Sequence, residues 1–454
     1  MGSAWLRSRG RGLRGFVIVL VGAISLLAAT PAAAGVIRTE FFGIVEGPVL
    51  DDPDMATMKS LRVQTDRFLL NWGWVEPTKG NYKWGPPDRF IGDMASHGIR
   101  AVPSVWGNPG WIPGSSSTPP IGGTPSQQQW RIFLKALVER YGPGGEYWGA
   151  RYHQQFGANA KPLPITSWQI WNEPNLKKYF APKPSPGQYA RLLQISYPSI
   201  KQVDKKAQVV LAGMTGKGDM TAVDFLKKLY AVSGIKGTFD ATALHPYMST
   251  VDQVKKTIQQ FRAAMVSHAD GATPLWISEL AWGSDPPDPA GINKGPQGQA
   301  QMLTKAYKLI LANRRPWNIQ HLFWYLLRDP LDPVASCSFC ASAGILNRNR
   351  IRKPAYNAFK AIVAEKVAPV PTITAGPAQG STTTDATPTF AFTSNEPGST
   401  FQCRFDSKPL VTCTSPTTPK AALTNGHHTF SVRAIDAPGN VSPLTARSFT
   451  VNAH

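Results

Sequence analysis

Acidic residues are scarce in this chain, and long apolar runs are nearly absent from it. Its 454 residues include 28 Asp and Glu against 48 Lys and Arg, a formal net charge of +20. A basic balance of this kind favours contact with acidic surfaces or polymers. The basic residues are scattered and form no basic helix, which disfavours nucleic acid as a partner. After residue 34 no apolar stretch approaches the roughly 20 residues of a membrane-spanning helix, so we expect no transmembrane segment in the mature chain.

Cysteine is also rare, with Cys337 and Cys340 in one string and Cys403 and Cys413 in another. Four cysteines allow three pairings, and the sequence alone does not choose among them. We expect two local disulfides, because the two pairs fall in different predicted domains. One Cys-x-x-Cys without a second Cys or His pair does not predict a metal site. His-Glu-x-x-His, Walker and Gly-x-Ser-x-Gly motifs are absent, so the sequence predicts no metal and no cofactor.

The first 34 residues have the composition of a secretory signal peptide. Four arginines precede the apolar run 16–29, and Pro31 to Ala34 supply small residues for cleavage. Removing residues 1–34 takes four charges from the +20, leaving +16 on the mature chain. We therefore expect a secreted, extracellular protein that could associate with the cell surface. A retained N-terminal anchor is the alternative.

Between residues 35 and 366, short apolar runs alternate with amphipathic helical stretches. The candidate strands are residues 40–45, 63–69, 99–105, 167–171, 208–212, 241–244, 275–278 and 319–324. Helical patterns occur at 88–97, 127–141, 186–203, 222–232, 251–268 and 297–313. Eight buried strands interleaved with helices are typical of an α/β protein with a (β/α)8 TIM barrel. An open doubly wound sheet is the alternative, but the Gly-rich phosphate turn expected after an early strand is absent.

The composition changes near residue 367, where Thr, Ser, Pro and Gly increase and helix formers decline. We place the boundary between Lys366 and Pro371, so that residues 367–454 form a second domain. Alternating runs and turn signals such as Asn425-Gly426 predict a small all-β sandwich. Around residues 401–403 and 428–434 this region resembles the bacterial Ig-like modules of exported proteins. That resemblance implies a spacer or a contact with the cell wall, and sugar binding is the alternative.

Two glutamates stand where predicted strands end. Glu173 follows the fourth candidate strand in the string Trp-Asn-Glu-Pro-Asn, and Glu279 follows the seventh. Because barrel active sites are built at the carboxyl ends of the strands, both carboxylates are expected to face one cleft. Cleaving a glycosidic bond needs a carboxylic acid to protonate the leaving oxygen and a carboxylate behind the anomeric carbon. The sequence predicts this chemistry at these two positions.

Residues 40 to about 360 resemble the clan A glycoside hydrolases, a barrel superfamily that includes families 5 and 39. In that clan an Asn-Glu-Pro string ends the fourth strand and carries the acid/base, and a glutamate ending the seventh strand is the nucleophile. The resemblance implies that Glu173 is the acid/base, that Glu279 is the nucleophile, and that Asn172 binds the sugar 2-hydroxyl. It also implies that Arg67 keeps the nucleophile ionised, because a guanidinium lowers the pKa of a neighbouring carboxyl group. Arg62 is the alternative for that role.

The same resemblance assigns the string His-Pro-Tyr after the sixth strand to the cleft. It implies that His245 contacts the sugar or the acid/base pair and that Tyr247 donates a hydrogen bond to Glu279. A satisfied core histidine is the alternative for His245.

Aromatic residues are expected to shape the cleft. Trp324, which ends the eighth candidate strand, matches the aromatic floor of clan A, with a core position as the alternative. Trp106 and Asn108 after the third strand, and Trp282 after the nucleophile, are expected as walls of neighbouring subsites. Several of the 14 tryptophans should line the groove, because Trp is seldom fully buried.

These observations predict a secreted retaining β-glycosidase that hydrolyses O-glycosidic bonds of a polysaccharide or oligosaccharide by double displacement. A solubilising surface is the leading explanation of the basic charge, and an acidic sugar as substrate is the alternative. The main alternative is a catalytically silent barrel that binds glycan and serves adhesion. A charge-driven binder of anionic polymers is a second alternative. The sugar, the linkage and endo or exo action are not predicted.

Overall fold

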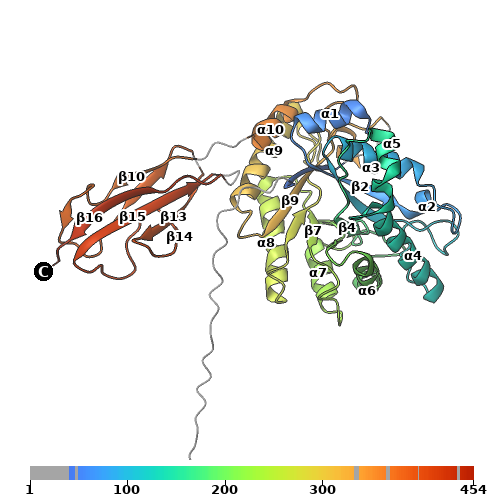
Figure 1. Cartoon of the computed structure of the whole chain (residues 1–454), viewed down its shortest axis with the longest axis horizontal. Helices are drawn as coiled ribbons and strands as arrows, with labels where there is room; N and C mark the ends of the chain where they lie inside the picture. The colour runs from blue at the N-terminus through green and yellow to red at the C-terminus, as the bar shows by residue number, and fades with distance from the viewer. Residues whose placement is uncertain are drawn as a thin grey trace, which may run out of the picture. The chain divides into compact units, whose positions relative to one another are not determined.

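The computed structural model describes residues 40–45, 50–331, 337–364, 369–396, 398–436 and 440–453. Its larger part is a parallel sheet surrounded by helices (Figure 1). The strands are β1 (Phe42–Val45), β2 (Thr65–Asn71), β3 (Arg100–Trp106), β4 (Ser167–Ile170), β5 (Gln208–Leu211), β6 (Met214–Thr215), β7 (Thr242–His245), β8 (Leu275–Ile277) and β9 (Ile319–Tyr325).

The sheet closes into a barrel of eight strands. Its hydrogen-bonded order is β5-β4-β3-β2-β1-β9-β8-β7-β6. The short β6 continues β5 after an interruption at Ala212 and Gly213, and a parallel bridge joins Val210 to Ala241, next to β7. Closure removes the free edges of the sheet. The predicted (β/α)8 fold is confirmed, and the open doubly wound alternative is wrong.

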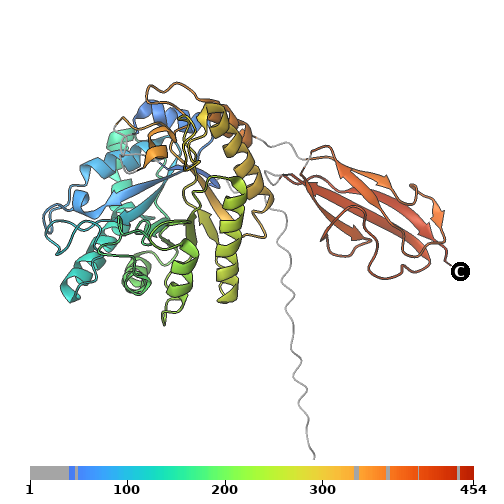
Figure 2. The same ribbon diagram turned by 180° about the vertical axis from the view of Figure 1, so that it is seen from behind.

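Helices cover the outside of the strands, as the front and rear views show (Figures 1 and 2). They are α1 (Asp52–Ser60), α2 (Trp72–Val75), α3 (Gly85–Ser96), α4 (Thr124–Tyr141), α5 (Ala150–Phe156), α6 (Pro186–Val203), α7 (Ala222–Tyr230), α8 (Val251–Ser267), α9 (Gly295–Ala312) and α10 (Pro354–Ala364). All eight predicted strands and all six predicted helices occur, with ends displaced by three residues at most. Helices α1, α2, α5 and α10 were not predicted.

Local sequence explains where several of these helices begin. Thr250 and Gln253 form a reciprocal capping box at the start of α8, which satisfies two backbone donors that the helix itself leaves unpaired. Ser185 caps α6 in the same position. The missed α1 carries the same kind of signal, because Asp51 accepts a hydrogen bond from the backbone of Asp54.

Alternation along the strands divides the apolar core into two layers. The side chains inside the barrel are Val45, Val102, Val210, Ala241, Ala243, Trp276 and Phe323. A much larger cluster fills the space between the strands and the surrounding helices. The direction of each side chain at a strand end therefore decides whether that residue reaches the cleft or the helix layer.

The C-terminal region is all-β, as predicted. One sheet pairs β10 (Pro371–Ala375) with β12 (Ala391–Ser394). The other contains β11 (Thr382–Thr383), β16 (Thr445–Val451), β15 (Gly426–Ile435), β13 (Thr400–Phe405) and β14 (Val411–Cys413), in that order. Both sheets contribute to an apolar core of their own, which includes Phe392, Phe430 and Phe449. The Ig-like assignment stays a prediction.

Both predicted local disulfides are present, Cys337–Cys340 and Cys403–Cys413. The predicted signal peptide, residues 1–34, lies outside the described residues, as do residues 366–368 of the predicted domain boundary. Among the described residues no helix is long and apolar enough to cross a membrane.

Candidate active site

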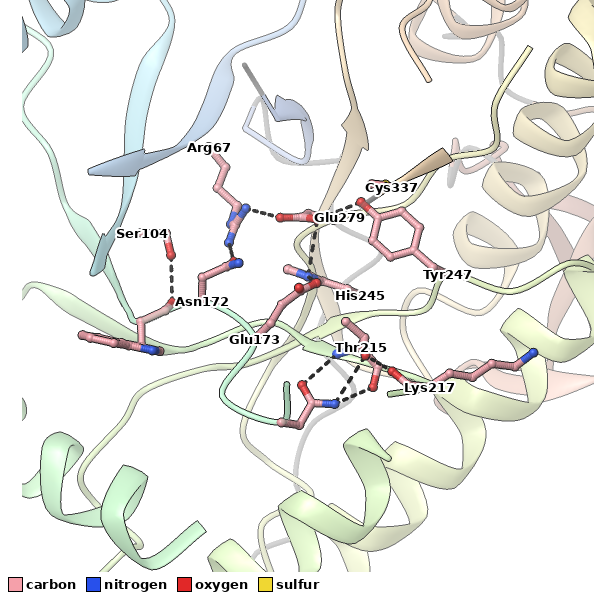
Figure 3. A network of polar contacts seen from close by, with 12 residues as sticks. Arg67, Ser104, Asn172, Glu173, Thr215, Lys217, His245, Tyr247, Glu279 and Cys337 are labelled. Atoms are coloured by element: carbon pink, nitrogen blue, oxygen red, sulfur yellow. Dashed lines mark hydrogen bonds and ion pairs between the residues drawn. The ribbon is translucent and has the colours of Figure 1, made fainter. Parts of the chain in front are cut away.

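The two predicted catalytic glutamates face each other at the carboxyl end of the barrel (Figure 3). Glu173 follows β4 and Glu279 follows β8, and both are almost fully buried. One oxygen of each carboxyl group and a ring nitrogen of His245 all lie within 4.8 Å of one another. This spacing is shorter than the roughly 6.5–9.5 Å that an inverting enzyme leaves for its water, and it is close to the separation in retaining enzymes.

Arg67 connects the two motifs from the interior of β2. Its Nη1 donates to Glu279 Oε1 at 2.5 Å, and its Nη2 donates to Asn172 Oδ1 at 2.7 Å. Its Nε donates to Gln169 at 2.6 Å. A guanidinium can only donate, so Asn172 must turn its oxygen to Arg67 and keep its amide N–H groups for another partner. The arrangement favours Arg67 over Arg62, because Arg62 is exposed.

His245 ends β7 and forms a hydrogen bond with Glu173. Its Nδ1 lies 2.8 Å from Glu173 Oε1 and 3.4 Å from Glu279 Oε2. Full burial, with Arg67 nearby, holds the pKa of His245 well below its usual value, so the ring is neutral. The ring lies against Gly213, where a Cβ atom would come within 1.9 Å of its Nε2. The glycine between β5 and β6 therefore makes room for this imidazole.

Tyr247 completes the surroundings of Glu279, because its hydroxyl donates to Oε2 at 2.7 Å. Burial raises the pKa of Glu279, while Arg67 and Tyr247 lower it. Glu173 has no comparable donors, and burial together with the charge of Glu279 raises its pKa well above the usual value. A single proton shared by the pair therefore resides on Glu173, and Glu279 is the carboxylate.

Glu173, His245 and Glu279 also satisfy the spacing of a three-ligand metal site. The guanidinium of Arg67 and the hydroxyl of Tyr247 already occupy both oxygens of Glu279. A cation placed between the three side chains would lie close to the charge of Arg67, which opposes metal binding. The donors fit a pair of reacting carboxyl groups better than a metal.

A cavity of about 860 Å³ opens over this pair. Arg67, Asn172, Glu173 and Glu279 line it, together with aromatic and apolar residues of β2, α2 and α3. The aromatic lining comes from Phe68, Trp74, Phe90, Tyr179 and Tyr325. The volume falls in the range of sites for small organic ligands.

The prediction that Trp324 forms the aromatic floor of the cavity is wrong, because the next residue in the chain lies there instead. Trp324 is fully buried in the helix layer, and its Nε1 donates to Ala343 O. Tyr325 is the residue that lines the cavity. Successive residues of a strand point to opposite sides, and Phe323 and Tyr325 share the interior side.

The prediction for Trp282 is also wrong. Its side chain is fully buried in the core, where Nε1 donates to Met248 O. More generally, Trp74 is the one tryptophan of the described residues that lines the cavity, and large aromatic side chains instead dominate the core. The assumption that tryptophans are seldom fully buried fails in a barrel with a thick layer of helices.

Trp106 and Asn108 stay predictions as subsite residues. Trp106 packs edge-on against Tyr179, with ring centroids 5.8 Å apart, which places it behind the cavity wall. The Nε1 of Trp106 and both amide atoms of Asn108 are buried without a hydrogen-bond partner. Buried polar atoms normally have partners, so these positions retain hydrogen-bonding capacity.

Tyr179 and Trp74 line the cavity but were not predicted as site residues. Tyr179 follows Glu173 by six positions, and Trp74 lies in the string Trp-Gly-Trp after β2. Their place in the loops at the carboxyl ends of strands was the available signal.

A family model described as the glycosyl hydrolase catalytic core matches residues 145–344, a segment that includes both glutamates. No curated protein sequence matches the chain.

Solved structures match most of the chain at low identity. A family 39 glycoside hydrolase from the gut symbiont Bacteroides cellulosilyticus is 18% identical, with 92% of this chain and 81% of that chain covered and a TM-score of 0.55. A family 39 β-xylosidase from Caulobacter crescentus is 17% identical, with coverage of 82% and 84% and a TM-score of 0.51. A family 5 enzyme from Bifidobacterium longum is 13% identical, with coverage of 75% and 81% and a TM-score of 0.53. Residues 145–344 thus match a glycosyl hydrolase catalytic core, and the chain shares the (β/α)8 barrel fold of these solved structures.

Proposed function

We propose that the protein is a secreted retaining β-glycosidase with Glu173 as acid/base and Glu279 as nucleophile. The observation that carries this proposal is the asymmetry of the two carboxyl groups. One oxygen of each lies within 4.8 Å of the other, yet of these two carboxyl groups only that of Glu279 accepts hydrogen bonds from Arg67 and Tyr247. A retaining mechanism needs such a pair, with one group protonated and the other ionised.

In the proposed reaction Glu279 attacks the anomeric carbon while Glu173 transfers its proton to the leaving oxygen. The C–O bond to the leaving group breaks, and an ester bond forms between the sugar and Glu279. Glu173, now ionised, then removes a proton from water, whose oxygen displaces Glu279 from the sugar. Two inversions give net retention. The free amide N–H of Asn172 suits a hydrogen bond to the sugar 2-hydroxyl.

The substrate we propose is a β-linked polysaccharide or oligosaccharide. Lys83 and Arg89 line the same cavity as the glutamates, which suits a sugar with an acidic group. Export is supported by the composition of residues 1–34 and by the two disulfides, which persist in oxidising compartments.

The test is hydrolysis of neutral and acidic aryl β-glycosides and polysaccharides by the wild type and by Glu279→Ala, with and without azide. We expect the variant to be inactive alone and to form a glycosyl azide of inverted configuration when azide replaces the missing carboxylate. Glu139→Ala is the matched control, since Glu139 is an exposed residue of α4. Glycan binding without hydrolysis by the wild type would instead support the silent-barrel alternative.

A further inference from the structure

A short disulfide-closed turn lies beside the nucleophile. Cys337 and Cys340 are bonded across three positions, and the 3-10 helix η2 (Ser338–Ser342) begins between them. The end of the turn is fixed by buried polar contacts. Ser342 O accepts from Gln299 Nε2 at 3.1 Å and from Lys353 Nζ at 3.0 Å.

Phe339 is the side chain that this turn presents to the site. Its ring centroid lies 4.9 Å from that of Tyr247 and 6.4 Å from that of Tyr325. The two tyrosine rings meet edge to face at 6.2 Å. Phe339 thus packs on two aromatic residues beside Glu279. One of them, Tyr247, donates a hydrogen bond to the carboxylate (Figure 3).

We infer that Phe339, held in place by the Cys337–Cys340 disulfide, is a positioning residue that keeps the Tyr247 hydroxyl on Glu279 Oε2. The inference rests on the proposed function, since Glu279 is the nucleophile only in that proposal. Phe339 itself does not line the cavity, so it acts through Tyr247. The disulfide limits the conformations of the turn that carries Phe339.

The contact matters because the bond from Tyr247 stabilises the ionised form of Glu279. The titratable and charged groups that face Glu279 share one cleft, and they are Arg67 from β2, Glu173 and Tyr179 after β4, His245 from β7, Tyr247 after β7 and Tyr325 from β9. Among the residues that the structure describes, Arg67 and Tyr247 are the two that donate to the carboxylate. When the tyrosine hydroxyl moves away, the pKa of Glu279 rises, and less of the enzyme carries an ionised nucleophile at acidic pH.

The experiment measures kcat and KM of the full chain on an aryl β-glycoside from pH 4 to pH 9. For Phe339→Ala and for Cys337→Ser/Cys340→Ser we expect the acid limb of kcat/KM to move to higher pH by about half a unit or more. At pH values on the acid limb, we expect kcat/KM of these variants to fall roughly three- to tenfold. Phe339→Tyr keeps the aromatic ring, so its pH profile should match that of the wild type.

Two controls separate positioning from a general loss of structure. Cys403→Ser/Cys413→Ser removes the other disulfide, which lies in the C-terminal region with its own core, and it should leave the pH profile unchanged. Tyr247→Phe and Tyr247→Phe/Phe339→Ala should show the same loss, because Phe339 has nothing left to position once the hydroxyl is absent.

An active wild type whose pH profile is unaltered by Phe339→Ala would overturn the inference and leave the proposed function standing. Additive losses in Tyr247→Phe/Phe339→Ala would overturn it as well, because Phe339 would then act independently of Tyr247. A wild type that hydrolyses no glycoside would remove the proposed function, and the inference with it.

Discussion

At the residue scale, the site depends on two buried carboxyl groups whose surroundings differ. Both lose solvation on folding, which raises the pKa of each. Glu279 recovers stabilisation from Arg67 and Tyr247, whereas Glu173 contacts a neutral His245. Glu173 therefore keeps its proton to higher pH, as an acid that protonates a leaving group must.

Glu173→Gln tests this protonation directly. Glutamine has nearly the same shape but cannot transfer a proton, so we expect kcat/KM to fall by about 10²–10⁴ for a glycoside with a poor leaving group. A dinitrophenyl glycoside, whose leaving group needs no proton, should lose far less in the first step. The basic limb of the pH profile, which reports deprotonation of Glu173, should disappear. Equal losses on both substrates would contradict the assignment.

A third buried carboxyl group has no part in the proposed chemistry. Asp66 of β2 is fully buried between Ile44 and Ala101 in the helix layer, and neither carboxyl oxygen has a hydrogen-bond partner. Burial raises its pKa well above the usual value. Its folded-state pKa exceeds its unfolded-state pKa, so the wild type loses stability as pH rises between the two values.

We therefore expect Asp66→Val to raise the free energy of unfolding of the barrel by about 1–3 kcal/mol. The gain should be larger at pH 8 than at pH 5, because unfolding of the wild type releases the proton of Asp66 and higher pH favours that release. Asp54→Val is the matched control. Asp54 is equally buried but is paired with Arg328 and Arg350, so its replacement should destabilise. Urea unfolding at both pH values measures the two effects, and a stability loss in Asp66→Val would show that Asp66 has a partner.

At the element scale, strand parity and close approaches decide which side chains reach the cleft. Trp324 and Tyr325 are adjacent in β9, yet one packs under the helices and the other lines the cavity. The interruption between β5 and β6 has a similar effect, because Gly213 leaves space for His245 and accepts a hydrogen bond from the backbone N–H of Glu173 at 3.1 Å.

Gly213→Ala should displace His245 without adding or removing a polar group. The new methyl would meet Nε2 within 1.9 Å and several other atoms of the same ring, which forces the imidazole away from Glu173. We expect kcat/KM to fall at least about tenfold, or ~1.4 kcal/mol of transition-state stabilisation. Gly187→Ala in α6 is the control, since a methyl there has open space. Steady-state kinetics of both variants decide the matter, and unchanged kinetics in Gly213→Ala would mean that the ring is not needed where it lies.

At the scale of the whole molecule, the barrel and the pair of glutamates were predictable, whereas their surroundings were only partly so. Each strand is indicated by a local apolar run, and the Asn-Glu-Pro string can be recognised without information about distant residues. The contact between Arg67 and Glu279 joins positions 212 residues apart, and only the family resemblance suggested it. The packing of Gly213 on His245, the unpaired state of Asp66 and the contact of Phe339 with Tyr247 depend on packing between segments far apart in the chain. No local pattern marks such contacts.

The barrel and the C-terminal region have separate apolar cores. The barrel core ends with residues of α10, and the C-terminal core begins at Ile373. All residues of the site belong to the barrel, so a chain ending at residue 366 should hydrolyse a soluble aryl glycoside with kcat/KM within about twofold of the full chain, a change of under ~0.5 kcal/mol.

If the C-terminal region contacts the cell wall, the shortened chain should be retained less on insoluble wall polysaccharide in a pelleting assay. Retention that depends on the basic charge should also weaken as salt is raised, because salt screens exposed charges beyond about 8–10 Å. A loss of soluble activity on truncation would instead mean that the second core supports the barrel, and equal retention of both chains would assign the wall contact to the barrel.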